Sequence, residues 1–442
     1  MDSARAQNLS TPLIRAGLCL LVFLQYNDAL LELIKPLPVF NLLSVGMLLL
    51  IVGAIRRTDP MQRLQGAWFV FVPIVAIVIL SGFSRFYAID TEKVTEDTVR
   101  MVKICLMVLI LAYGVTSTRD LMAVIHAFIV AGVALGGFMI LESFNGGPLL
   151  NFERHEETLD IFDGFFRSTG LSMESPPMAA TMALCGATMS AVMFVRRGRL
   201  RFFYALGFLI PAAAVVASLT RSATLALTFV IVILIWRLRR RREFLWAVLT
   251  GLSVVFVTVV LLPPEAWTKL RLLIDPDQDH TIVRRLSYQI IGWDLFVQSP
   301  VFGVGSGNFN EHYASVDYRF VPGRGDEPRP LHNIYLQYLS ELGVLGFALF
   351  IGIIGSVSRA LGRVASSSSC PDLRLQADVL LVGFFSTLLQ LFFLSSNFLF
   401  PFWAIIGLSV AVIHLDKGSA KCSDRGAERE TAHRLDVQPV PE

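Results

Sequence analysis

The chain has 442 residues, of which 54% are hydrophobic and 17% are charged, and its formal net charge is +3. A soluble domain usually carries about 25% charged residues, so this composition excludes an ordinary soluble enzyme, a disordered chain and a collagen-like chain. The apolar residues form continuous runs rather than the alternating pattern of a transmembrane β-barrel. The composition therefore predicts an all-α polytopic membrane protein.

Apolar runs near the roughly 20 residues that a membrane-crossing helix needs occur twelve times along the chain. They lie near residues 13–33, 37–55, 65–82, 99–116, 120–142, 176–195, 201–217, 221–237, 243–262, 333–356, 374–396 and 399–415. Alternate short loops are basic, and their arginines are Arg56, Arg57, Arg63, Arg119, Arg196, Arg197, Arg199, Arg201, Arg237, Arg239, Arg240, Arg241, Arg242, Arg359, Arg363 and Arg374. Because basic loops stay in the cytoplasm, this pattern predicts about 12 transmembrane helices with both termini inside.

Two loops on the predicted outer side are long, about 143–175 and 263–331. In the second, Leu286, Ile290, Trp293 and Val297 recur at helical spacing and predict an amphipathic helix over 282–298. Pro300 ends that helix, and a glycine-rich stretch follows. We therefore expect four regions, which are helices 1 to 9 in 1–262, a large outer loop containing helices in 263–331, helices 10 to 12 in 332–416 and a disordered cytoplasmic tail in 417–442.

Four arginines on the predicted outer side are candidates for binding an anion. Arg221 follows a tight turn between two apolar runs, where an arginine is costly unless it is paired or faces a wet cavity. It is therefore either an interfacial arginine or an anion-binding residue. Arg284 and Arg285 begin the amphipathic helix, where a solvated polar face would also explain them. Arg167 ends the acidic outer loop and is uninformative alone.

His332 lies where the large loop enters a membrane helix, beside Asn333 and close to Tyr335. A single histidine is more often structural than catalytic. This one lies at the predicted membrane surface, next to the only loop large enough to build a site. A neutral imidazole there could take a proton from a sugar hydroxyl, so His332 is the strongest catalytic candidate.

The sequence offers weak evidence for a metal or cofactor. Asp275, Asp277 and Asp279 alternate along the large loop, but an EF-hand starting at Asp275 needs glycine at its sixth position and glutamate at its twelfth. This chain has His280 and Leu286 there. No phosphate-binding P-loop or zinc-protease motif occurs. We expect neither a metal ion nor a cofactor, and no nucleic-acid partner.

Several fragments occur in an order that resembles the superfamily of bacterial O-antigen ligases and O-antigen polymerases. They are the turn Ser218-Leu219-Thr220-Arg221, then Arg285, the stretch Ser299-Pro300-Val301-Phe302-Gly303-Val304-Gly305-Ser306-Gly307, the run His332-Asn333-Ile334-Tyr335-Leu336 and finally Glu341-Leu342-Gly343-Val344-Leu345-Gly346. They cover roughly 215–350, and the helix pattern extends the resemblance over the chain. The resemblance implies a GT-C-like membrane glycosyltransferase of the bacterial inner membrane, with its large loop and active site in the periplasm.

The resemblance also implies partners and residue roles. The donor would be a glycan on undecaprenyl pyrophosphate, and the acceptor a sugar hydroxyl of lipid A-core. His332 would activate the acceptor hydroxyl, and Arg221 and Arg285, with Arg167 as a further contact, would bind the donor's pyrophosphate. Asn333, Tyr335 and Arg284 would support them. Because pyrophosphate is a good leaving group, an inverting transfer needs neither a metal nor a nucleotide, and two guanidinium groups could neutralise its charge.

Three other functions remain open. A polymerase that joins lipid-linked repeat units shares these motifs with the ligases. A protein O-oligosaccharyltransferase is less favoured, because such members are often longer at the C-terminus. A transporter of polyprenyl-linked glycan would also have many helices and basic residues, but it does not predict a histidine at the edge of a long outer loop.

Overall fold

The structure is a computed structural model that describes residues 2–32, 45–46, 67–150, 161–162, 165–196, 200–218, 220–239, 280–394 and 398–436, with the single positions 245, 249, 252 and 256. The described residues are predominantly helical. A minimal antiparallel hairpin of β1 (Ile161–Phe162) and β2 (Phe165–Phe166) pairs Ile161 with Phe166. The predicted all-α architecture is confirmed in the described part of the chain.

Helices occupy ten of the twelve predicted membrane segments. In chain order they are α1 (Asp2–Tyr26), α5 (Trp68–Phe83), α6 (Thr91–Gly114), α7 (Thr118–Asn145), α8 (Pro176–Arg196), α9 (Arg201–Ala217), α10 (Arg221–Leu238), α15 (Ile334–Ser367), α16 (Pro371–Leu391) and α17 (Phe400–Asp436). Five described stretches are long and apolar enough to cross a membrane, and they are Trp68–Phe86, Thr118–Asn145, Pro176–Val195, Ile334–Ser367 and Phe400–Gly418. The predicted segments 37–55 and 243–262 lie almost entirely outside the described residues. Twelve spanning helices therefore stay a prediction.

Polar side chains fix where several of these helices begin. The carboxylate of Asp90 accepts a hydrogen bond from the N–H of Lys93 at the start of α6, at 2.9 Å. The hydroxyl of Ser117 accepts one from the N–H of Asp120 at the start of α7, at 3.2 Å. Such caps satisfy backbone donors that have no partner inside the helix. Pro371 starts α16, a position that tolerates proline because its missing N–H is not needed there.

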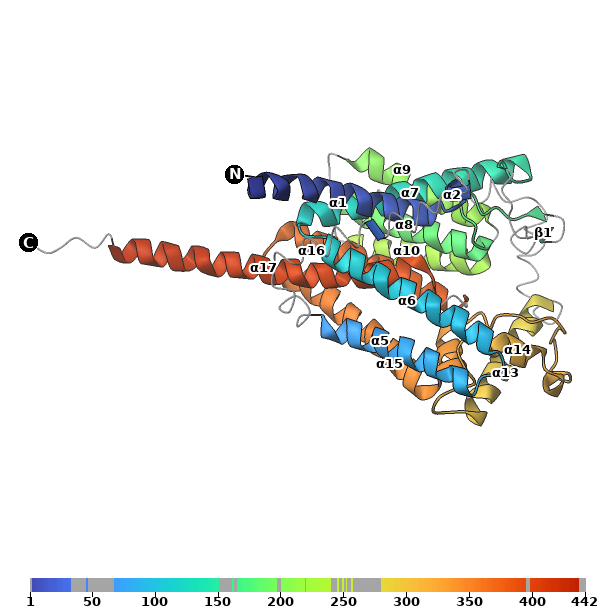
Figure 1. Cartoon of the computed structure of the whole chain (residues 1–442). Coiled ribbons are helices and arrows are strands. Elements are labelled where there is room, and N and C mark those ends of the chain that lie inside the picture. Colours follow the sequence, from blue (N-terminus) through green and yellow to red (C-terminus); the bar gives the residue numbers. More distant parts are fainter. Residues whose placement is uncertain are drawn as a thin grey trace, which may run out of the picture.

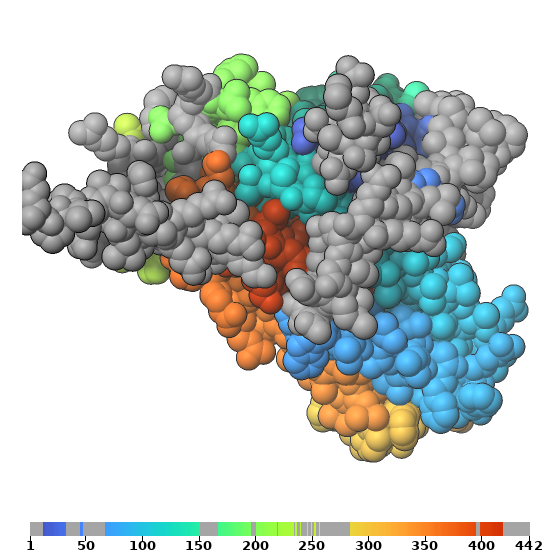
Figure 2. Space-filling model, turned by 60° about the vertical axis from the view of Figure 1, so that its left-hand side comes forward, coloured from blue at the N-terminus to red at the C-terminus, as the bar shows by residue number. Residues whose placement is uncertain are grey.

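The helices pack as one apolar bundle. α8 lies against α7, α9 and α16, while α15 packs on α5 and α16, and α17 packs on α6 and α16. Figure 1 shows both chain termini at one end of the bundle, with a short hairpin at the other end. Figure 2 shows α5 and α6, in blue and cyan, side by side on one face, with the orange of α15 next to them. One continuous core of buried apolar side chains joins the bundle.

The described part of the large loop folds around a small core of its own at the end of the bundle that lies opposite the termini (Figure 1). It contains α13 (His280–Gln298), α14 (Phe309–Ala314) and the short η4 (Val316–Tyr318). The predicted amphipathic helix is thus confirmed. Its buried face, however, carries Tyr288, Ile291 and Leu295, whereas the apolar stripe that identified it is exposed, with Leu286, Ile290, Trp293 and Val297 between 46% and 59% accessible.

The C-terminal segment differs from the expectation of a disordered tail over 417–442. α17 continues as a helix to Asp436 and projects from the bundle (Figure 1). The low apolar content of this segment argues against a packed core but not against a helix. Its alanine, glutamate, lysine and arginine residues have high intrinsic helix propensity, which explains the difference.

The glycine-rich stretch 303–307 is built into a break in α15. Gly343 has φ 66° and ψ −168°, so the helix is interrupted there. The N–H groups of Val304 and Gly305 donate to the carbonyls of Ser340 and Glu341, each at 2.9 Å, and the N–H of Val344 donates to the carbonyl of Pro300 at 2.8 Å. These are backbone groups that the break leaves without helical partners. The loop therefore replaces the lost helical hydrogen bonds and fixes the first two turns of α15 in place.

Only glycine fits at the two positions of closest approach. A Cβ on Gly343 would lie 2.2 Å from the carbonyl oxygen of Val301, and a Cβ on Gly303 would lie 2.3 Å from the carbonyl carbon of Glu341. Both glycines also have positive φ, of 66° and 70°. The two glycine motifs, which are distant in sequence, are thus the two sides of a single backbone contact.

Candidate functional site

His332 occupies a strained turn at the entrance to α15. Its φ is 57°, which makes it the one non-glycine residue with positive φ among the described residues. The next residue, Asn333, caps α15, and its side-chain oxygen accepts hydrogen bonds from the N–H groups of Tyr335 at 3.1 Å and Leu336 at 3.3 Å. A strained backbone conformation that the surroundings hold in place is a common property of functional sites.

The environment of His332 keeps its imidazole neutral. Burial is the largest cause, followed by the positive charges of Arg285 and Arg329, and together they lower the pKa of His332 from 6.5 to about 4. The ring also lies 5.6 Å from the ring of Tyr288, between centroids. A neutral imidazole at pH 7 has a free lone pair and can accept a proton, as a general base must.

A relay of amide side chains holds the entrance of α15 against α13. The side-chain N–H of Asn333 donates to the Oε1 of Gln289 at 3.1 Å, and the Nε2 of Gln289 donates to the carbonyl of Leu331 at 3.3 Å. Gln289 lies one helical turn after Arg285 on α13. This relay therefore fixes the arginine and the histidine relative to each other. Asn333 thus ties the start of α15 to α13, and its predicted role in supporting the site stays a prediction.

Arg284 and Arg285 are both exposed on α13, and both lower the pKa of the nearby Tyr288 hydroxyl against a larger effect of burial. Arg284 accepts a hydrogen bond at its backbone carbonyl from Ser287, which is a local helical contact. Tyr335 points away from this group, because its hydroxyl donates to the carbonyl of Leu388 at 3.0 Å and its ring packs on Phe392. Tyr335 therefore joins α15 to α16 rather than reaching the histidine.

Arg167 and Arg221 form a second group on the other side of α16. Arg221 is exposed at the first position of α10. The guanidinium of Arg167 donates to the carbonyl of Ser218 at 3.3 Å and to the hydroxyl of Thr220 at 3.0 Å, so it holds the turn that places Arg221. The buried carboxylate of Glu142 fixes the residues that follow Arg167, because it accepts hydrogen bonds from the hydroxyl of Ser168 at 2.6 Å and from the N–H of Gly170 at 2.9 Å.

The end of α16 connects the two groups. Its Gln390 donates from Nε2 to the carbonyl of Ser222, next to Arg221, at 3.0 Å. Two residues earlier, the carbonyl of Leu388 accepts a hydrogen bond from the hydroxyl of Tyr335 at the start of α15. The structure thus brings the predicted residues together as two pairs, His332 with Arg285 and Arg221 with Arg167, at one end of neighbouring helices.

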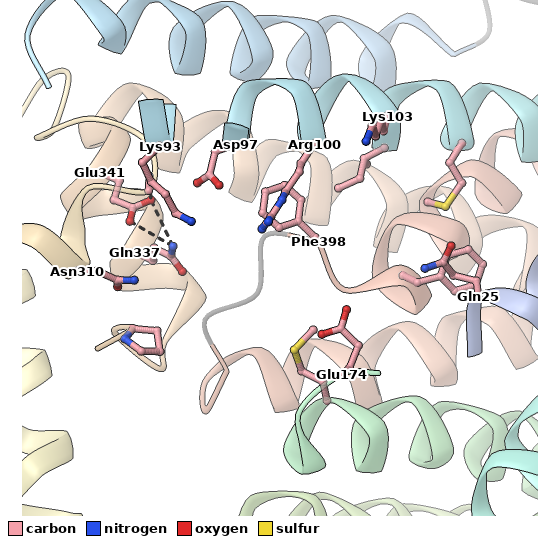
Figure 3. A pocket seen from close by; sticks show the side chains of 16 residues that line it. Gln25, Lys93, Asp97, Arg100, Lys103, Glu174, Asn310, Gln337, Glu341 and Phe398 are labelled. Atoms are coloured by element: carbon pink, nitrogen blue, oxygen red, sulfur yellow. Dashed lines mark hydrogen bonds between the residues drawn. The ribbon is translucent and has the colours of Figure 1, made fainter. Parts of the chain in front are cut away.

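A cavity of about 600 Å³ opens beside the entrance of α15, and sequence reasoning missed it. Figure 3 shows its polar side chains converging from several elements. They are Gln25, Lys93, Asp97, Arg100, Lys103, Glu174, Asn310, Gln337 and Glu341. Pro330 and Gln337, which flank His332 in the chain, also line it. The signal available in the sequence was the spacing of Lys93, Asp97 and Arg100, which puts all three on one face of the helix.

The buried carboxylate of Glu341 forms one wall of this cavity. It accepts hydrogen bonds from the N–H of Gly307 at 3.0 Å and from the Nε2 of Gln337 at 3.2 Å. Across the cavity, burial is the largest cause that raises the pKa of Glu174 to about 7, and the charge of Asp28 adds to it. Glu174 is therefore close to half protonated at neutral pH. Its carboxyl group can both donate and accept hydrogen bonds there.

Among the described residues, no group of three or more histidine, cysteine, aspartate or glutamate side chains is arranged to hold a metal ion. The alternating residues Asp275, Asp277 and Asp279 lie outside the described residues. The absence of a metal or cofactor thus stays a prediction.

A family model described as O-antigen ligase matches residues 206–351. The comparison with curated proteins gave no match. One solved chain, described under "Structural coordination of polymerization and crosslinking by a peptidoglycan synthase complex", has a TM-score of 0.44 and 18% identity over 79% of this chain and 98% of that chain, a similarity too low to carry an argument. The family match spans α10, α13 and the broken start of α15, and it includes Arg221, Arg285 and His332. Residues 206–351 are therefore similar to the O-antigen ligase family, which supports the resemblance to O-antigen ligases and O-antigen polymerases that the sequence motifs indicate.

Proposed function

We propose that the protein is an O-antigen ligase that transfers a glycan from undecaprenyl pyrophosphate to a sugar hydroxyl of lipid A-core. The observation that carries this proposal is the neutral His332 beside Arg285, at the entrance of a membrane helix and within the matched family region. A proton acceptor next to a fixed cation suits a transfer in which a hydroxyl loses a proton while a phosphate leaves.

The transfer step balances without a cofactor. The acceptor hydroxyl gives its proton to the free ring nitrogen of His332, and its oxygen forms a bond to the anomeric carbon of the donor sugar. The bond between that carbon and the pyrophosphate oxygen breaks on the opposite face, so the configuration inverts. Undecaprenyl pyrophosphate leaves with the electron pair, and the guanidinium groups of Arg285 and Arg221 stabilise its added charge. Arg167 acts by holding the turn before Arg221.

The membrane arrangement is part of the same proposal. The chain crosses the bacterial inner membrane twelve times, with the large loop and the site in the periplasm and both termini in the cytoplasm. Two features support it, namely that both termini lie at one end of the bundle and that the loop helices lie at the other (Figure 1). The exposed apolar stripe of α13, which includes Trp293, also suits a helix that rests on the periplasmic surface of the inner membrane.

The chosen acceptor distinguishes the ligase from a polymerase, which would use the same residues but join two lipid-linked repeat units. The discriminating experiment is complementation of a ligase-deficient Gram-negative strain, with O-antigen on lipopolysaccharide visualised on a gel. Wild-type protein should restore the ladder. Restoration of polymerisation in a polymerase-deficient strain instead would assign the protein as a polymerase.

Three variants test the residue roles at matched membrane expression. His332→Asn keeps a residue that tolerates positive φ but cannot act as the base, so the ladder should disappear. Arg285→Gln and Arg221→Gln should each weaken it strongly. Arg359→Gln is the matched control, because this exposed arginine lies in the second half of α15 and its side chain donates to its own helix at Gly355. An active His332→Asn protein would refute the assigned base.

A further inference from the structure

The cavity beside α15 is separate from the pair of His332 and Arg285 and from the pair of Arg221 and Arg167. It is bounded by α1, α6, α8, α14, α15 and α17, and among the described residues that line it none belongs to α10 or α13. It nevertheless reaches Pro330 and Gln337, which lie on either side of His332 in the chain. None of His332, Arg221 and Arg285 lines it, so the cavity is distinct from the residues assigned to the donor.

One face of α6 gives the cavity its polarity. Lys93, Arg100 and Lys103 all line the cavity at the loop-facing part of the helix, and Figure 3 shows Arg100 and Lys103 on the same ribbon. Farther along the same helix, Ile104 and Met107 line it. Asp97 lines the cavity between Lys93 and Arg100, so the loop-facing part of this wall is charged with an excess of cations, and the wall becomes apolar farther along the helix. An amphipathic ligand with a charged head and an apolar chain matches this order of side chains.

Hydrogen-bonding and apolar groups complete the walls. The amides of Gln337 and Asn310 lie at the end nearest the large loop, where they can bind hydroxyl groups. Phe398 lies under Arg100, with the guanidinium carbon 5.4 Å from the ring centroid, so the cation has an aromatic support. Phosphate and sugar hydroxyls are the groups that such an arrangement binds.

We propose that this cavity binds the phosphorylated saccharide head of the membrane glycolipid that serves as acceptor. Arg100 and Lys103 bind its phosphate, Gln337 and Asn310 bind sugar hydroxyls near His332, and its apolar chains extend past Ile104 and Met107. The inference rests on the proposed function, because it assigns the second substrate of the same reaction to this cavity. The donor carries a phosphorylated head too, so the experiment must separate the two lipids.

Removing the charge of Glu96 should change the affinity for a phosphorylated head in the opposite direction to removing a cation. It is exposed, it does not line the cavity, and it accepts hydrogen bonds from Lys93 at 3.1 Å and from Arg100. While it pairs with these cations, it competes with any phosphate that they bind. Glu96→Gln should therefore strengthen binding of a phosphorylated head, whereas Lys103→Gln should weaken it. A purely structural role for these residues would not produce opposite changes in affinity.

The experiment measures lipid binding to the full-length protein, delipidated and placed in phosphatidylcholine nanodiscs. The probes are bisphosphorylated lipid A, its monophosphorylated form and undecaprenyl pyrophosphate. Lys103→Gln should lower affinity for bisphosphorylated lipid A about ten-fold, and Glu96→Gln should raise it about three-fold. Both should leave undecaprenyl pyrophosphate binding within about two-fold of wild type, and Arg359→Gln should change neither lipid.

Two results would overturn the assignment. Equal affinity of wild type, Lys103→Gln and Glu96→Gln for lipid A would show that the cavity does not bind its phosphate. Altered binding of undecaprenyl pyrophosphate, with lipid A unaffected, would show that the cavity belongs to the donor. Because the readout is binding, it is independent of glycan transfer. Loss of ligase complementation with retained, charge-dependent lipid A binding would refute the proposed function and leave the cavity assignment standing.

Discussion

The pH dependence of transfer offers a sharp test of the environment of His332. A histidine with the ordinary pKa of about 6.5 is only about 9% neutral at pH 5.5. With its pKa lowered to about 4 by burial and by Arg285 and Arg329, the same side chain is about 97% neutral at that pH. If neutral His332 is the base, transfer should remain close to its maximum at pH 5.5 and should fall only near pH 4.

The assay follows kcat/KM for the donor at saturating acceptor, with purified protein and purified lipid substrates between pH 4 and 8. The acid side of this profile reports the pKa of the free enzyme's essential base. His332→Asn should give a rate lower by a factor of about 10² to 10⁴ that no longer falls near pH 4. Loss of half the wild-type activity near pH 6.5 would refute the proposed environment.

A neighbouring charge can be removed as a second step. Arg329 is exposed, pairs with Glu327 at 2.6 Å and is not assigned to donor binding. Arg329→Gln should raise the pKa of His332, so activity should begin to fall at a higher pH than in wild type. The shift should stay under about one pH unit, because the arginine is screened by solvent and its charge is the smallest of the three causes. An unchanged profile would exclude Arg329 as a cause.

Three further predictions follow from the same structure. Gly343→Ala should lower the thermal midpoint of the purified protein by several degrees, because its Cβ would meet the carbonyl of Val301. Gly352→Ala in the same helix is the control, since its Cβ would meet nothing within 4 Å and should not destabilise the protein. Equal midpoints for the two variants would refute the backbone contact. The pKa of Glu174 is raised from 4.5 to about 7, so the loss of folding stability caused by burying its charged carboxylate is absent below pH 4.5 and complete above pH 7. Glu174→Gln should therefore raise the thermal midpoint more at pH 8 than at pH 5. The reverse order would contradict the raised pKa. A cysteine at Asp326, whose side chain is fully exposed in the large loop, should react with a membrane-impermeant maleimide in spheroplasts of a cysteine-free background; labelling only after lysis would place the loop inside.

The architecture was largely accessible from the sequence because its signals are local. Long apolar runs and basic loops depend on neighbouring residues, and ten of the twelve predicted segments contain helices. The face of α13 that packs inward was not accessible in the same way. Periodicity finds an apolar stripe but does not say what covers it, and the structure buries Tyr288 and Leu295 while leaving Leu286 and Trp293 exposed.

The candidate site, too, was only partly predictable from the sequence. The motifs found His332 and Arg285, and the structure brings these two together because Asn333 and Gln289 tie their helices. The cavity could not be found in this way. Its walls come from helices far apart in the chain, since Gln25 and Phe400 are 375 positions apart. Only the packing of α17 against α6 and α15 brings such side chains to one place.

Under the proposed function, the break in α15 lets one short segment contact both substrates. A continuous helix would satisfy its own backbone, and nothing would hold the 300–309 loop to it. At Gly343 the helix instead leaves backbone groups without helical partners, and the loop forms hydrogen bonds with them. The N–H of Gly307 in the same loop donates to the carboxylate of Glu341. That carboxylate faces the cavity, and the turn containing His332 lies at the other end of the same short helix. The contact that fixes the cavity wall therefore also fixes the histidine, which is what a transfer between two separately bound lipids requires.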